Sequence, residues 1–242
     1  MKQSLIVVIV FVCKLANGFA QGNKPTIIKD NMLWLGYYST INLNPKWSVN
    51  SDLQLRTRNE IKNYSQVLIR TDVSRRLSEK ITATIGLAHF RFFITNTRTR
   101  GEWRPWQEFK LQDELGKVKV THRLRIEERY NEVVENNTNT GKYLFNFRFR
   151  YKLDIRFRLN KEKENAKNLV GIIGNEIMVN AGKVIRYNYF DQNRTYAGLN
   201  LELNKSISFQ IQYMHFWQQL SNGYQLNSTN VLRFNIYHTI SL

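Results

Sequence analysis

Hydrophobic and polar residues alternate with a period of two along most of this chain. In the last twelve residues, VLRFNIYHTISL (231–242), Leu232, Phe234 and Ile236 fall on one side, whereas Arg233 and Asn235 fall on the other. Such alternation predicts β-strands whose two faces meet different environments. Each alternating segment is near or above the roughly 9–11 residues of a strand that crosses a membrane at a tilt. The eleven predicted strands are about 31–43, 47–58, 65–77, 80–93, 104–115, 118–130, 143–159, 168–180, 194–203, 207–218 and 229–242.

Four predicted hairpins are internally consistent, because in each of them a single register matches the residue types on both faces of the paired strands. A two-residue loop at Gly116 and Lys117 pairs Leu115 with Val118, and a glycine at the first loop position suits a type II′ turn. Apolar residues then meet apolar residues and charged residues meet charged residues, as a correct register requires. The further pairs of this hairpin are Leu111–His122, Phe109–Leu124, Glu114–Lys119, Lys110–Arg123 and Glu108–Arg125. Turns at 44–46, 78–80 and 204–206 sort their flanking strands in the same way.

The alternation alone does not separate a membrane barrel from a soluble β-sandwich, because both have one apolar face. Three features favour the membrane: an export signal without a cysteine framework, aromatic residues near strand ends (Trp47, Tyr130, Tyr143), and longer polar loops at 94–103, 131–142, 181–193 and 219–228 that alternate with short turns. The sequence therefore predicts an all-β fold, a transmembrane antiparallel up-and-down β-barrel of 10–12 strands. Because bacterial single-chain barrels have an even count, twelve is preferred, with residues 25–30 as an additional strand.

The N-terminus has the features of a secretory signal. Lys2 precedes the apolar run 5–12, and Gly18 and Ala20 are the small residues before a cleavage site. We expect residues 1–20 to be a cleaved signal peptide and 21–242 to be one outer-membrane barrel domain; an N-terminal anchor helix is the alternative. Cys13 is the only cysteine, so the mature chain would have no disulfide and no cysteine metal site. The four histidines lie on separate predicted strands, and we expect neither a metal nor another cofactor.

The predicted inward face is rich in arginine, in keeping with a formal net charge of +17. One hypothesis is a structural lumen, in which arginines and carboxylates link neighbouring strands, with Glu108–Arg125 as the best example. The other is a path or pocket for an anionic ligand, because the arginine excess would leave guanidinium groups unpaired. Within FDQNR (190–194), Asp191 and Arg194 would pair with each other or with a lumen residue. Glu176 is expected to meet an arginine. The lumen and ligand candidates are Arg56, Arg58, Arg70, Glu108, Arg123, Arg125, Glu127, Arg129, Arg148, Arg150, Asp154, Glu176, Asp191 and Arg194.

Two other functions are less favoured by the sequence. An outer-leaflet lipid-modifying enzyme, of lipase or deacylase type, would need a histidine and a serine close together on one strand face. His215 and Ser221 are six residues apart across a predicted loop, so no catalytic residue is assigned. A pI near 10 with alternating aromatic residues would suit nucleic acid. Export and the need for the aromatic face to meet lipid argue against a nucleic-acid partner.

Five sequence blocks resemble one family. They are LWLGYYSTINLNPKWSV (33–49), HRLRIEERY (122–130), FRFRYKL (147–153), NEIMVN (175–180) and FDQNRTYAGL (190–199). The chain resembles an uncharacterised family of outer-membrane β-barrels, catalogued as a domain of unknown function and found chiefly in Bacteroidetes. The resemblance implies location in the outer membrane of a Gram-negative bacterium, contact with its lipid, and insertion by machinery that reads the last strand. It implies no activity and no oligomeric state, and Leu242 stands where an aromatic residue is commoner.

Overall fold

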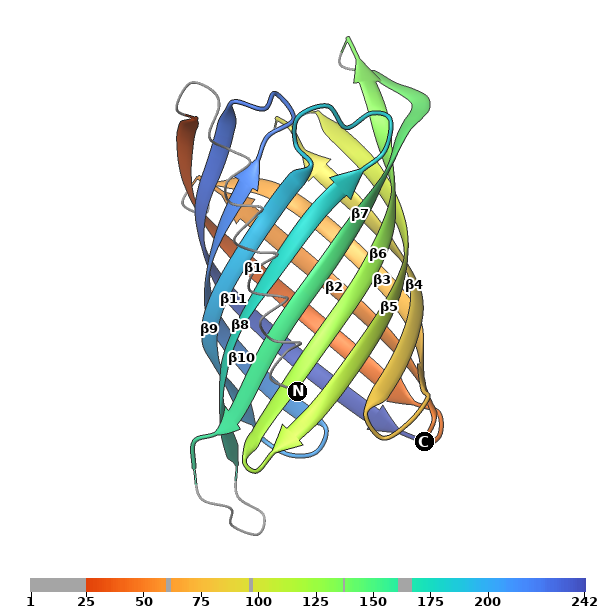
Figure 1. The fold of residues 1–242 in the computed structure, drawn as a ribbon, viewed down its shortest axis with the longest axis vertical. Coiled ribbons are helices and arrows are strands. Elements are labelled where there is room, and N and C mark those ends of the chain that lie inside the picture. The colour runs from red at the N-terminus through yellow and green to blue at the C-terminus, as the bar shows by residue number, and fades with distance from the viewer. Residues whose placement is uncertain (1–24, 60–61, 96–97, 137, 161–166) are drawn as a thin grey trace, which may run out of the picture.

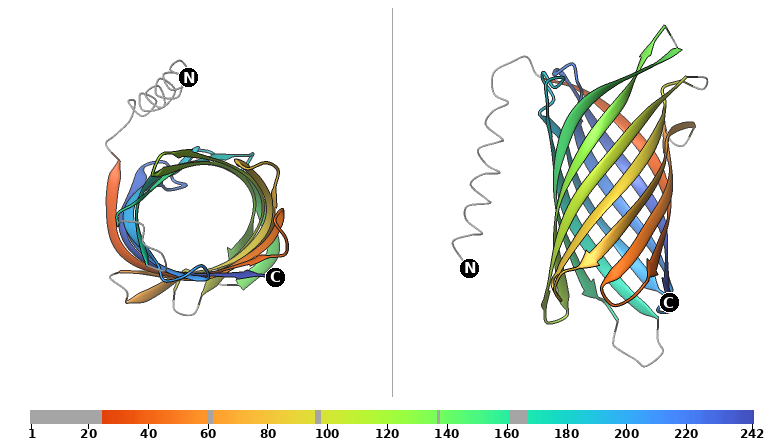
Figure 2. Two further views of the ribbon diagram at one scale, coloured as in Figure 1. Left: turned by 90° about the horizontal axis from the view of Figure 1, so that it is seen from below. Right: turned by 90° about the vertical axis from the view of Figure 1, so that its right-hand side faces the viewer.

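The computed structural model describes residues 25–59, 62–95, 98–136, 138–160 and 167–242, which form one closed β-barrel (Figure 1). Figure 2 shows the ring of strands from one end and their common tilt from the side. Each strand pairs with the next one along the chain, so that the connections are up-and-down. The strands are β1 Thr26–Asn42, β2 Trp47–Arg58, β3 Asn63–Arg76, β4 Ile81–Phe93, β5 Thr99–Leu115, β6 Val118–Glu135, β7 Thr138–Arg158, β8 Asn168–Ala181, β9 Phe190–Glu202, β10 Ile207–Gln219 and β11 Gln225–Ser241.

The ring closes through a parallel pair, β1 with β11. The pairing runs without a break from Thr26 beside Gln225 to Asn42 beside Ser241. With eleven strands the first and the last run in the same direction, so the closing pair must be parallel while every other pair is antiparallel. The preferred count of twelve is therefore wrong, although eleven lies within the expected range. Residues 26–30 lengthen β1 and do not add a strand, because they continue its pairing with β11.

The predicted hairpin registers are confirmed. Glu108 lies opposite Arg125, Phe109 opposite Leu124, and Leu115 opposite Val118 across the turn. Gly116 has a φ of +63°, a conformation that glycine adopts without the clash of a Cβ. The other three hairpins have the expected pairs Ile41–Val49, Val73–Ile85 and Leu201–Phe209.

Several strands are longer than the alternation indicated, and the predicted contrast between short turns and long loops holds only in part: the connection at 182–189 is long, as predicted, but the others are shorter. Strands β6 and β7 take up most of 131–142, and β9 already begins at Phe190. The 159–167 connection between β7 and β8 is longer than those at 59–62, 94–98 and 220–224, although it lies at the other end. The extra lengths include many polar residues, and local hydrogen bonds hold them. Glu132 accepts a hydrogen bond from the Gly101 amide at 2.7 Å, and the Thr140 hydroxyl donates to the Val133 carbonyl at 2.9 Å.

The two faces of the barrel have opposite chemistry. Apolar side chains point outward, and Ile85 (67% exposed), Leu124 (59%) and Phe109 (57%) show how open that wall is. Arginines, carboxylates and amides line the inside. This arrangement contradicts the soluble sandwich, whose apolar face would be buried in a core. Among the described residues no helix is long and apolar enough to span a membrane. The predicted signal peptide, 1–20, lies outside the described residues.

Candidate functional site

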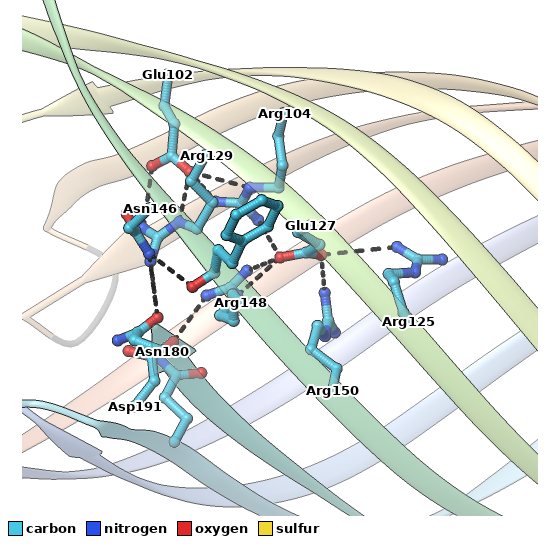
Figure 3. Close-up of polar contacts among 12 residues, drawn as sticks. Glu102, Arg104, Arg125, Glu127, Arg129, Asn146, Arg148, Arg150, Asn180 and Asp191 are labelled. Atoms are coloured by element: carbon cyan, nitrogen blue, oxygen red, sulfur yellow. Dashed lines mark hydrogen bonds and ion pairs between the residues drawn. The ribbon is translucent and has the colours of Figure 1, made fainter. Parts of the chain in front are cut away.

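The candidate site is the polar interior of the barrel. A cavity of about 570 Å³ runs through it, and its lining extends from Lys119, the second residue of β6, to Gln218 near the end of β10. The strands from β5 to β9 contribute a dense set of charged side chains, shown in Figure 3. Because side chains alternate along a strand, these residues reach the interior at every second position.

Glu127 of β6 lies at the centre of this set and is 1% exposed. Its Oε2 accepts hydrogen bonds from Arg148 Nε at 2.7 Å and Nη2 at 2.5 Å, and its Oε1 accepts one from Arg150 Nη1 at 2.5 Å. Arg104 approaches to 3.5 Å and Arg125 to 3.9 Å. One carboxylate thus organises arginines from three strands, β5, β6 and β7 (Figure 3).

Two carboxylates of β5, Glu102 and Glu108, extend the set in both directions from Glu127. Glu102, with no exposed surface, accepts hydrogen bonds from Arg104 at 2.6 Å and from Arg129 at 2.8 Å. Glu108 binds Arg125, whose Nη2 is 2.5 Å from its Oε2. Arg125 also stacks on the ring of Trp106 at 3.7 Å, a cation–π contact inside the lumen.

Glu176 of β8 and Asp191 of β9 complete the set. Glu176 accepts hydrogen bonds from Arg150, at 2.6 Å and 2.9 Å, and from Arg123. Asp191 accepts one from Arg148 Nη1 at 2.9 Å. The β8–β9 register shifts between Met178 and Val179, and a bulge of this kind places an additional residue on one face. Asp191 and the next residue, Gln192, are accordingly both buried, against the strict alternation.

Arginines outnumber carboxylates in this arginine–carboxylate network. Its members are Arg104, Arg123, Arg125, Arg129, Arg148, Arg150 and Arg194 on one side, and Glu102, Glu108, Glu127, Glu176 and Asp191 on the other. Seven cations share five anions, so the network keeps a positive excess. Nearby, Asp154 is shared by Lys152 and Arg156, each at 3.0 Å, and accepts a hydrogen bond from the Tyr196 hydroxyl at 2.8 Å.

A second group of arginines, with mainly neutral partners, gathers around Trp34 of β1: Arg56 of β2 and Arg233 of β11 come from the opposite wall, and Arg194 comes from β9. Arg56 lies over the indole at 3.9 Å, Arg194 at 5.4 Å and Arg233 at 5.6 Å. Arg56 donates to the side-chain oxygens of Gln66 and Gln54. We call Arg56, Arg194 and Arg233 the Trp34 arginine cluster.

The guanidinium groups of this cluster donate mainly to glutamine and tyrosine oxygens, whereas those of the network donate mainly to carboxylates. Arg233 donates to Gln212 at 3.1 Å and to the Tyr38 hydroxyl at 3.4 Å. Arg194 donates to Gln192 at 2.8 Å and lies 3.7 Å from Glu176. The Nε atoms of Arg56 and Arg233 are buried and have no hydrogen-bond partner among the described residues.

The structure brings most of the predicted lumen residues together, but not all of them. Arg70 lies on the opposite wall and forms a two-pronged pair with Asp52, at 2.8 Å and 3.1 Å. Arg58, the last residue of β2, donates a hydrogen bond to the Ile94 carbonyl near the end of the barrel. Of the two alternatives predicted for Asp191 and Arg194, pairing with each other is wrong. Each of them instead pairs with another lumen residue.

Sequence reasoning missed Glu102, because the segment before residue 104 was expected to be a loop. The signal was present, since Glu102, Arg104, Trp106 and Glu108 are spaced by two. Trp34 and Arg233 were assigned to strands but not to a site, because only closure of the ring pairs β1 with β11 and so places Trp34 beside Arg233. No group of three or more His, Cys, Asp or Glu residues that could hold a metal occurs in the described ranges.

The comparison with the NanC porin structure agrees with this fold. The NanC porin structure has a TM-score of 0.52 at 14% identity, and the match covers 86% of this chain and 98% of that one. The β-domain of the Bordetella autotransporter BrkA has a TM-score of 0.41 at 10% identity, covering 70% of this chain and 76% of that one. No curated protein matches. Residues 31–227, most of the chain, match the model of a family described as protein of unknown function, DUF2490. The chain therefore belongs to the DUF2490 family.

Proposed function

We propose that this protein is an outer-membrane barrel whose lumen conducts or binds small anions. The observation that carries the proposal is the charge of the cavity wall. In the network, arginines outnumber the carboxylates that they share. The Trp34 arginine cluster adds Arg56 and Arg233, whose partners are neutral. Arg56, Arg233 and the network arginines other than Arg125 line one cavity of about 570 Å³, within the size range of small-molecule sites.

Electrostatics in a narrow channel gives this excess its effect. A ring of positive charge between low-dielectric walls focuses the field and favours anions over cations. Guanidinium groups also match carboxylate and phosphate oxygens in geometry, because they present paired N–H donors. Arg56 and Arg233 donate to glutamine and tyrosine oxygens, which carry no charge to offset that of the guanidinium groups.

The outer wall and the N-terminal sequence support the proposed location in the outer membrane. An apolar belt of side chains such as Ile85 and Phe109 suits the hydrocarbon of a bilayer. The apolar run 5–12 suits export. Membrane lipid is then the constant partner of the barrel, and the insertion machinery meets it during biogenesis.

The test is the conductance of the refolded mature chain in a planar bilayer with about a tenfold KCl gradient. We expect a zero-current potential of the sign that anion selectivity gives. The double variant Arg56→Gln, Arg233→Gln should reduce that potential, because it removes two lumen charges without touching the arginine–carboxylate network. The matched control is Arg75→Gln, an exposed arginine over Trp47 on the outer wall, which should leave the potential unchanged.

A folded barrel that does not conduct is tested for binding by titration with inorganic phosphate. Tryptophan fluorescence is the readout, and the change should disappear in Trp34→Phe. Cation selectivity, or a barrel that neither conducts anions nor binds phosphate, would overturn the proposal.

A further inference from the structure

A serine, a histidine and an asparagine meet on the outer wall, where strand β10 pairs with β11. His215 Nε2 lies 3.5 Å from the Ser228 hydroxyl oxygen, and His215 Nδ1 lies 2.9 Å from Asn230 Oδ1. His215 and Asn230 are direct partners in the β10–β11 register, and Ser228 precedes Asn230 by two, on the same face. A hydroxyl, an imidazole and a side-chain oxygen in this order are the elements of an activated nucleophile.

The position of Asn230 determines which imidazole nitrogen carries the proton. Its Nδ2 donates to Asn31 Oδ1 at 3.1 Å, so its Oδ1 faces the ring. That oxygen also accepts a hydrogen bond from the Tyr213 hydroxyl at 2.7 Å. An acceptor beside Nδ1 keeps the proton on that nitrogen and leaves the Nε2 lone pair directed at Ser228, as a general base requires.

The other histidines of the barrel have different partners. His122 Nδ1 lies 2.8 Å from the Tyr151 hydroxyl, and His238 Nδ1 lies 3.0 Å from the Tyr37 hydroxyl. His89 packs on the ring of Trp103, with 4.4 Å between the ring centroids. The partners of these three histidines are aromatic residues, whereas His215 has a serine hydroxyl at one ring nitrogen and an amide oxygen at the other.

A polar cleft of about 570 Å³ begins at Ser228. Lys29, Asp30, Asn31, Asn59, Lys62, Ser228 and Asn230 line it. Lys29 is the β1 neighbour of Ser228 in the parallel pair that closes the barrel. Two lysines, Lys29 and Lys62, therefore line the same cleft as a hydroxyl with an adjacent base.

The surroundings place this group at the level of lipid headgroups. Ser228 is near the start of β11, at the end of the barrel opposite to the C-terminus (Figure 1). The ring of Trp217 packs edge-on against His215, with 5.2 Å between centroids, and is 37% exposed. Aromatic residues of a membrane protein gather at the interface, and polar side chains are costly deeper in the hydrocarbon. The ester bonds that join acyl chains to lipid headgroups lie at this depth.

We propose that Ser228, His215 and Asn230 form a lipid-ester hydrolase site on the outer wall of the barrel, acting on acyl esters of anionic lipids. The Ser228 oxygen attacks the ester carbonyl carbon while its proton passes to His215 Nε2. The tetrahedral intermediate collapses, the bond to the alcohol oxygen breaks, and His215 returns the proton to the leaving alcohol. Water then attacks the acyl-serine with the same proton transfers, and a fatty acid leaves.

Each remaining residue has a role that follows from its place. Asn230 is a positioning residue, which holds the ring and its tautomer. Lys29, beside the nucleophile, stabilises the negative charge that develops on the carbonyl oxygen. Lys62, which also lines the cleft, suits a phosphate of the headgroup. This site is separate from the lumen, so it does not depend on the proposed anion pathway.

The experiment uses the refolded mature chain, with heat-modifiable migration on a gel as the check of folding. Labelling by a fluorophosphonate probe and fatty-acid release from phosphatidylglycerol vesicles are measured for each variant. A parallel assay with purified lipopolysaccharide distinguishes glycerophospholipid from acylated glycolipid as the source of the ester. We expect labelling at Ser228 and acid release, both lost in Ser228→Ala, and reduced roughly 100-fold or more in His215→Gln.

Two further variants separate catalysis from structure. Asn230→Leu should reduce release strongly, and Asn230→Asp should restore it, because aspartate also accepts a hydrogen bond from Nδ1–H; a purely structural role would not give this rescue. Ser221→Ala, in the β10–β11 connection, is the matched control and should leave release unchanged. A folded barrel that releases no fatty acid from either lipid and takes no label would overturn the proposal, as would activity that persists in Ser228→Ala.

Discussion

Replacing Glu127 by glutamine tests whether the arginine–carboxylate network holds the barrel together. Glu127 is 1% exposed and accepts three hydrogen bonds from Arg148 and Arg150, at 2.5 to 2.7 Å. Glutamine keeps the shape but removes the charge. Seven arginines would then share four carboxylates, and the two guanidinium groups would retain only Asp191 and Glu176.

The expected loss of stability follows from burial. Removing one partner of a buried ion pair costs about 3–5 kcal/mol, because the charge left behind is neither solvated nor neutralised. At about 1.4 kcal/mol per tenfold, this is a decrease of roughly 100- to 4,000-fold in the folding equilibrium constant. The assay is reversible urea unfolding in lipid vesicles, followed by tryptophan fluorescence.

The matched control is Glu114→Gln on the same sheet. The Glu114 side chain is 66% exposed and lies 3.2 Å from Lys119. An exposed pair is worth about 0–1 kcal/mol and is screened by salt, so the control should change stability little. If Glu127→Gln costs no more than Glu114→Gln, the network is hydrated and the argument from desolvation fails.

Two more perturbations test the wall itself. Glu108→Arg and Arg125→Glu should each destabilise the barrel by several kcal/mol, because each places two like charges where the ion pair now lies 2.5 Å apart. The double swap should recover part of this loss. Unfolding titrations in which the two single effects simply add would exclude the pairing. Gly86→Val should cost about 1–3 kcal/mol in the same titration, because a Cβ at Gly86 would lie 2.6 Å from the Trp106 ring, and an unchanged midpoint would mean that the ring moves freely.

The sequence by itself determined which side chains face the inside and the outside of the barrel wall, and how neighbouring strands pair across short turns. A period of two assigns each side chain to a face, and short turns link the strands, so hairpin registers such as Glu108 opposite Arg125 follow from pattern alone. The same alternation predicted an arginine-rich inside and an apolar outside. These properties are local, because they depend on residues that are neighbours along the chain or across one turn.

Only the tertiary structure decided what depends on closure and on irregularity. The number of strands in the ring determines that β1 meets β11 in parallel, which places Trp34 beside Arg233 and Asn31 beside Asn230. The bulge in the β8–β9 pair turns Asp191 inward against the alternation. His215 was weighed against Ser221, six residues away, because 219–228 was expected to be a loop, whereas β11 begins at Gln225 and its pairing with β10 brings Ser228 to His215. Contacts between distant strands depend on the shape of the whole ring, and no period along the chain encodes that shape.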